Sequence, residues 1–436
     1  MTQLSELQSA LRAGKLKLST YLAEVCDLIE KTDGHLHVFV AGGFDRSRIE
    51  ADAERLEEHF PIPEIRPPLY GLPLGVKDIY NVDGFPTACG SKVPSDLFTG
   101  PEASAVTRLR SAGVLIMGKT VTTEFACYMP GPTRNPRNPD HTPGGSSSGS
   151  AAGVATGFFP VALGTQTVGS VIRPAGFCGV VGFKPSFGRI PTDGIVPVST
   201  SEDHVGYYSA DVTGLSLVAP YLIDDWRGAM DPGSVSRGEL RIGIPEGPYL
   251  ERATQEGRAQ FASSVQRLAK AGLVAVPCQA LAGIEAMYEC HMKVFCAEMA
   301  HAHRAWYRDH SLDYGSGTAE LIERGLSIDD RELEVQLAQM AGNREMMKRL
   351  MEARGIDYWL APSATGPAPK GLESTGDPIM NLPWTHLGMP VVSIPSGMNP
   401  DGLPFGLQLV ARPGRDEELV GFAEVVAKAL SCERQV

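Results

Sequence analysis

Short apolar segments alternate with helical patterns along much of this 436-residue chain, and that alternation limits the folds it can adopt. Strand candidates lie at 74–76, 114–116 and 161–163, and helical patterns occupy 104–112 and 151–157. Strands separated by helices are typical of α/β proteins. The sequence therefore predicts an α/β fold with a central mixed twisted β-sheet that is covered by helices on both faces.

The domain organisation follows from how this pattern changes along the chain. Residues 214–350 are more helical and more charged than the rest, and apolar strand candidates return at 391–394 and 406–410 before a last helix at 417–430. We find no internal repeat with a period of 20–50 residues. We therefore expect a single domain over 1–436, in which 214–350 form an inserted helical layer over the active-site end.

The charge balance argues against several classes of partner. Asp and Glu number 51 against 39 Lys and Arg, so the net charge is −12. Nucleic acids and anionic membrane surfaces attract basic proteins, so we expect neither as a partner. The segment Met1–Leu7 lacks the basic start and apolar run of a secretory signal, and no stretch of 18 apolar residues occurs. These features predict a cytoplasmic protein.

The cysteines and histidines give no pattern typical of a metal site. None of the eight cysteines forms a C-x-x-C pair, which favours buried free thiols over structural zinc. His301 and His303 lie two residues apart on a predicted helix and would point to different faces. We therefore expect no metal and no organic cofactor.

The run Gly144–Ser150 has three simple interpretations. It lacks the Lys-Ser/Thr pair that a phosphate-binding P-loop requires. Gly145–Gly149 matches G-x-S-x-G with Ser147 as nucleophile, but the residues before it are typical of a loop, whereas that motif follows a strand. A flexible linker is the third interpretation, although the run leads directly into an apolar helix.

A second loop, Gly164–Pro174, follows the strand candidate 161–163. Consecutive backbone N–H groups in such a turn can form a concave anion site, which suits a developing oxyanion. Ser170 lies inside this turn, where it is placed as a nucleophile.

A serine nucleophile needs a base, and Lys77 is the best candidate. Lys77 lies in the apolar run Gly75–Ile79, where loss of solvation should lower its pKa. A neutral lysine can accept a proton. The alternative for this residue is a salt bridge to a nearby carboxylate.

Several motifs together resemble the amidase signature family over most of the chain. The resemblance is carried by Gly75–Asp78, Gly144–Ser150, the Ser170 loop and Cys178–Ser186, and extends to 201–206 and 402–409. It implies a mixed sheet covered by helices and a Ser–cis-Ser–Lys triad. In this chain the triad would be Ser170 as nucleophile, Ser146 as the cis-peptide serine and Lys77 as base, with an oxyanion hole of backbone N–H groups at Thr167, Val168, Gly169 and Ser170.

Three positions depart from the common family pattern. Gln166 replaces Asp, Val168 replaces Gly, and the usual Arg position holds Ile172, with Arg173 next. A valine would be strained at position 168 if that position required a positive φ. Gln166 and Arg173 resemble a malonamidase-like subgroup that binds a substrate carboxylate through this arginine. Alternatively, Arg173 holds the loop by bonding to backbone.

The resemblance implies an amidase that hydrolyses a C–N bond of a small amide or carbamate through a seryl acyl-enzyme. A carbamate hydrolase (urethanase) and the amidase subunit of a tRNA-dependent amidotransferase are alternatives. A binding protein without activity is a third. A stand-alone enzyme would need only its small-molecule substrate, and could form a homodimer.

Overall fold

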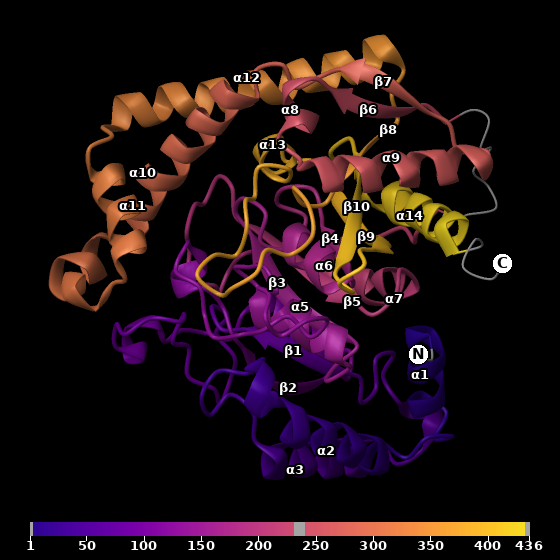
Figure 1. Cartoon of the computed structure of the whole chain (residues 1–436). Helices are drawn as coiled ribbons and strands as arrows, with labels where there is room; N and C mark the ends of the chain where they lie inside the picture. The colour runs from indigo at the N-terminus through magenta and orange to yellow at the C-terminus, as the bar shows by residue number, and fades with distance from the viewer. Residues whose placement is uncertain (1–2, 231–239, 432–436) are drawn as a thin grey trace.

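The computed structural model describes residues 3–230 and 240–431 and contains one ten-stranded sheet (Figure 1). The strand order is β2-β1-β3-β5-β4-β9-β10-β8-β6-β7. The strands are β1 (Pro73–Lys77), β2 (Leu115–Thr120), β3 (Val161–Gln166), β4 (Val181–Lys184), β5 (His204–Ser209), β6 (Ile242–Glu246), β7 (Ala275–Gln279), β8 (Tyr358–Pro362), β9 (Val391–Met398) and β10 (Pro404–Ala411).

The sheet is mixed. Strands β2, β1 and β3 run parallel at one end and β8, β6 and β7 run parallel at the other, while the pairs between them are antiparallel. Every residue of β1 to β5 and of β8 is buried. Such strands are covered on both faces, which explains their continuous apolar character. The predicted α/β fold is confirmed.

The described residues also form α-helices. They are α1 (Leu4–Arg12), α2 (Leu18–Leu36), α3 (Arg46–His59), α4 (Ser104–Ser111), α5 (Ser148–Thr156), α6 (Ile172–Cys178), α7 (Thr213–Leu222), α8 (Pro248–Glu251), α9 (Gln255–Lys270), α10 (Ile284–His310), α11 (Ser316–Leu326), α12 (Asp330–Arg354), α13 (Leu382–His386) and α14 (Asp416–Ser431). Helices α5 and α6 pack together against the sheet, and α14 packs against α7, α9 and the strands β9 and β10.

Helix α5 lies close to its neighbours because its residues are small. A Cβ at Gly149 would lie 2.2 Å from the carbonyl oxygen of Val38, and one at Gly153 would lie 2.1 Å from the Phe159 ring. The sequence SGSAAGVAT therefore lets the helix pack tightly against this part of the core. This packing fixes the start of α5, where Ser146 and Ser147 lie.

Residues 214–350 contribute both strands and helices. Within this range β6 and β7 extend the sheet, and the long helices α10 and α12, with α11, form an arm at its edge (Figure 1). Strand β7 is at the sheet edge and contains Pro277, which edge strands tolerate. That 214–350 are an insertion within a single domain stays a prediction.

Two smaller observations bear on the sequence predictions. The seven described cysteines are free thiols, and six of them are buried, as predicted; Cys432 lies outside the described residues. None of the helices in the described ranges has the length and apolar character needed to cross a membrane.

Candidate active site

Lys77 is the last residue of β1 and is fully buried. Its Nζ donates to Ser146 Oγ at 2.7 Å and to Thr165 Oγ1 at 2.8 Å. Because β1 and β3 pair in parallel, their carboxyl ends lie side by side, and this brings Lys77 next to Thr165. The structure therefore joins two of the predicted catalytic residues, Lys77 and Ser146, by a direct hydrogen bond.

Burial lowers the pKa of Lys77 to about 7, and the charge of Asp203 opposes that shift. The alternative prediction for Lys77 is a salt bridge to a nearby carboxylate. Asp78, the next residue, pairs with Lys119 at 2.8 Å rather than with Lys77. A pKa of about 7 would leave a substantial fraction of Lys77 neutral near neutral pH, and its role as a base stays a prediction.

The buried Asp78–Lys119 ion pair stabilises the chain next to Lys77. Both side chains are 1% exposed, and Lys119 Nζ also donates to the carbonyl of Pro86 and to Thr87 Oγ1. We expect Lys119→Met to lower the free energy of unfolding by about 3–5 kcal/mol, because Asp78 would be left buried without its partner. Urea denaturation would measure this loss. The double variant Asp78→Asn, Lys119→Met should recover part of it, and a loss below about 1 kcal/mol in the single variant would contradict the prediction.

Ser146 and Ser147 immediately precede α5, and the Gly145–Ser146 peptide bond is cis. Ser147 is fully buried. Its Oγ donates to the Thr165 carbonyl at 3.2 Å and accepts from the Thr165 N–H at 3.3 Å. The hydroxyl of Ser147 is therefore occupied by the backbone of β3, which disfavours the G-x-S-x-G interpretation.

Ser170 lies in the turn between β3 and α6 and is 8% exposed. Its carbonyl accepts from Tyr208 Oη at 3.0 Å and from the N–H of Ser147 at 3.4 Å. These bonds hold the Ser170 turn against the start of α5. Among the contacts of the described residues, however, the hydroxyl of Ser170 makes no hydrogen bond to Ser146, so the structure joins these two loops through their backbones.

The backbone of this turn offers free donors. Within the described part of the chain, the N–H groups of Val168, Gly169 and Ser170 donate to no acceptor, whereas those of Val171 and Ile172 donate to Gln166 Oε1 at 2.8 and 2.9 Å. Three adjacent free N–H groups beside a serine suit an oxyanion. Gln166 therefore shapes the turn.

The valine at position 168 does not strain the turn. Val168 is absent from the residues with positive φ, so the expected conflict with its branched side chain does not arise. Its carbonyl accepts from Thr385 Oγ1 at 2.7 Å. Gly169 is constrained instead, since a Cβ there would lie 2.6 Å from Asn381 Oδ1. Thr167 is fixed by a 2.6 Å bond from its Oγ1 to Asp203.

Arg173 lies in the first turn of α6 and is 4% exposed. Its Nη2 donates to the Gly145 carbonyl at 2.8 Å and to Thr375 Oγ1 at 2.9 Å, while Nε and Nη1 are buried and have no hydrogen-bond partner among residues 3–230 and 240–431. Burial lowers its pKa to about 10, which leaves it charged at neutral pH. Both predicted roles fit this geometry, because one side of the guanidinium holds the loop and the other is unpaired.

Sequence reasoning missed the residues that hold this constellation together. The residues that bind the loops or Lys77 are Thr165, Thr375, Thr385, Asp203 and Tyr208. Thr165 and Asp203 lie in segments that the sequence analysis singled out, but no role was predicted for any of the five. Threonine and tyrosine hydroxyls serve many local purposes, so only the strand pairing shows which of them converge.

Comparison with known proteins identifies the family. The sequence profile of the amidase family matches residues 21–420. Among curated relatives, the A subunit of the glutamyl-tRNA(Gln) amidotransferase from Anaeromyxobacter sp. (strain K) is 32% identical, with 92% of this chain and 91% of the relative covered. Its counterpart from Koribacter versatilis (strain Ellin345) is 30% identical, with 92% and 93% covered.

Solved structures agree with this match. A structure described as an amidase is 29% identical, has a TM-score of 0.87, and is covered over 100% of both chains. The native peptide amidase from Stenotrophomonas maltophilia is 25% identical with a TM-score of 0.82, over 98% of this chain and 96% of that one. This chain therefore belongs to the amidase family and is a hydrolase that acts on C–N bonds.

Proposed function

We propose that the chain cleaves an amide C–N bond with Ser170 as nucleophile, Ser146 as proton relay and Lys77 as base. The observation that carries this proposal is the 2.7 Å hydrogen bond from the buried Lys77 Nζ to Ser146 Oγ, beside the turn that presents Ser170. Lys77 forms no salt bridge with any described residue, and with a pKa of about 7 it can act as a general base.

The reaction divides into acylation and deacylation. Neutral Lys77 accepts the proton of Ser146, which accepts the proton of Ser170 as the Ser170 Oγ bonds to the carbonyl carbon. The free N–H groups of Val168, Gly169 and Ser170 stabilise the oxyanion. Ser146 returns a proton to the leaving nitrogen, the C–N bond breaks, and water releases the acid from Ser170 by the same route.

Arg173 indicates the substrate class, which we propose to be a small amide that carries a carboxylate. Within the described part of the chain, its Nε and Nη1 are buried and make no hydrogen bond, although Asp377 acts on the guanidinium electrostatically. A substrate carboxylate would satisfy both groups in a charge-assisted pair. The Gln166 and Arg173 variants resemble the malonamidase-like subgroup and support the same substrate class.

We expect Arg173→Met to lower kcat/KM for an anionic amide such as malonamate about 10- to 100-fold, the equivalent of roughly 1.5–3 kcal/mol for one charge-assisted contact. A neutral amide of similar size should lose much less. Both substrates would be measured with the same enzyme preparation.

The matched control for this variant is Thr375→Val. It removes one bond from Arg173 Nη2 but keeps the guanidinium and its unpaired side. It should change the two substrates equally. If Arg173→Met also lowers both equally, Arg173 acts through the Gly145 loop, and carboxylate recognition is rejected.

The biological setting is best indicated by the curated relatives. Those compared are amidotransferase A subunits, and this favours an amidase subunit of a tRNA-dependent amidotransferase over a carbamate hydrolase. Such a subunit works with partner chains. Steady turnover of simple amides by the purified chain alone would favour a stand-alone amidase, whereas activity that appears only with partner subunits would support the amidotransferase. Aryl carbamates in the same screen would test the urethanase alternative.

A further inference from the structure

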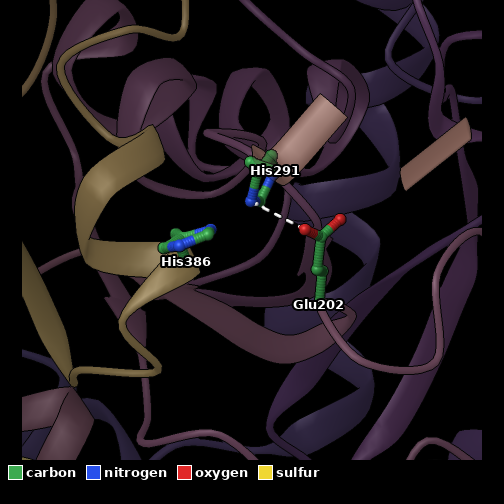
Figure 2. Close-up of side chains that lie close together, drawn as sticks. All are labelled: Glu202, His291 and His386. Atoms are coloured by element: carbon green, nitrogen blue, oxygen red, sulfur yellow. Dashed lines mark ion pairs between the residues drawn. The ribbon is translucent and has the colours of Figure 1, made fainter. Parts of the chain in front are cut away.

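Three buried side chains that the proposed mechanism does not use lie close together in the structure. Glu202 comes from the loop before β5, His291 from α10, and His386 from the last position of α13 (Figure 2). Each is 0% exposed. The three side chains face one another across a common space, although they come from distant parts of the sequence.

The geometry resembles that of a metal-binding cluster. One ligand atom from each residue lies within 4.8 Å of the other two, and Glu202 Oε1 lies 2.8 Å from His291 Nδ1. Among the described residues, no hydrogen bond of good geometry reaches the carboxylate oxygens of Glu202 or the Nδ1 of His386, although Ser199 lies close enough to Glu202 to interact with it. Buried polar atoms without partners are costly, so several of them facing one space call for a common partner.

We infer that Glu202, His291 and His386 bind a zinc ion. Two imidazoles and one carboxylate are a common ligand set for zinc. Tetrahedral coordination with bonds of about 2.0–2.2 Å needs ligand atoms roughly 3.3–3.5 Å apart. Glu202 Oε1 and His291 Nδ1, now 2.8 Å apart, would therefore separate slightly to admit the ion. A water molecule would fill the fourth position.

The surroundings provide the outer contacts that such ligands use. Asn343 Nδ2 lies 3.0 Å from His386 Nε2. If the amide turns by half a rotation, its oxygen accepts the Nε2–H, and Nδ1 is free to bind the metal. Orientation of a metal-bound histidine through its second nitrogen is the usual arrangement in zinc sites.

The local charge also favours a cation. Asp203 and Glu298 are near enough to act electrostatically on Glu202, so three carboxylates gather here. Arg344 is the cation that acts on the same group, and it donates to the carbonyl of His386 rather than to Glu202. A divalent ion bound to Glu202 would stabilise its charged form, which burial and the two neighbouring carboxylates otherwise disfavour.

A zinc ion here would connect three segments that the sheet does not hold together directly. It would tie α10 and α13 to the loop before β5, next to Asp203, which fixes Thr167 in the Ser170 turn. The sequence predicted no metal site because the three ligands lie far apart along the chain and form no short motif. The inference does not depend on the proposed function, since its test measures metal content.

The test uses the full chain, expressed in zinc-supplemented medium, with any affinity tag removed. Elemental analysis after gel filtration should find about one zinc ion per chain. Chelator treatment should remove it, and one equivalent of zinc should then raise Tm by at least about 3 °C. Less than about 0.1 zinc per chain in the untreated protein, with no effect of added zinc on Tm, would overturn the inference.

Variants separate this site from binding by the free cysteines. Glu202→Gln and His386→Asn should each lose most of the zinc and the response of Tm to zinc. The matched control is His303→Asn. His303 is buried and lies in α10, the helix that also contains His291, but its nitrogens bond to Tyr314 and Pro197. His303→Asn should keep its zinc even if its Tm falls. Equal zinc content in all three variants would place the metal elsewhere and reject the assignment.

Discussion

Replacing Ser170 with alanine should abolish covalent labelling by a fluorophosphonate and lower kcat/KM for any amide substrate by about 10³-fold or more. The reason is that Ser170 lies in the turn that carries three free N–H donors and touches the start of α5. Without its hydroxyl no acyl-enzyme can form. Intact-mass spectrometry of labelled protein is the measurement, with a steady-state assay beside it.

The matched control is Ser147→Ala, which removes a buried hydroxyl from the neighbouring loop. Ser147 bonds to the backbone of Thr165, so its loss should affect stability more than labelling. Peptide mapping of the wild-type adduct should locate the label on Ser170. A label on Ser146 or Ser147, or full labelling of Ser170→Ala, would show that the nucleophile has been assigned to the wrong loop.

Much of the sheet could be predicted from the sequence because most of its strands are buried on both faces, with β7 at the edge as the main exception. Val161–Leu163 is a continuous apolar run, Val391–Ile394 is apolar except for Ser393, and both fall inside strands of the structure. The order of ten strands could not be predicted, since β9 lies between β4 and β10 although it follows β8 in the chain. Such neighbours are set by packing over long sequence separations, which local patterns do not record.

Some residues of the candidate site could also be predicted from the sequence, and others could not. Lys77 could be proposed as a base from the sequence, because its apolar neighbours indicate a buried strand and burial lowers the pKa of a lysine. Thr165 and Thr375, which bind Lys77 and Arg173, could not be found. They reach the site only through strand pairing and loop packing. Val168 shows the opposite case, since the expected strain depended on a backbone angle that the chain does not adopt.

The pH profile follows from the burial of Lys77. Its pKa is lowered from 10.5 to about 7, so the neutral form that can accept a proton dominates above pH 7. We expect kcat/KM to rise as pH increases through about 7 and to level off above it. Lys77→Met should lower kcat/KM by about 10²- to 10⁴-fold, the usual contribution of a general base, and remove the rise. Activity measured from pH 5 to 9 would check both.

Asp203 provides a second test, because replacing it should shift the midpoint of the pH profile in a known direction. A lysine with only a structural role would not produce this shift. Its negative charge raises the pKa of Lys77 and so opposes the effect of burial. Asp203→Asn should therefore move the midpoint of the wild-type rise to lower pH, because Lys77 then loses its proton more easily. The variant also weakens the bond to Thr167, so its maximal rate should fall, but a lower rate alone does not move a midpoint. A shift to higher pH, or an unchanged rise in Lys77→Met, would mean that a group other than Lys77 controls the profile.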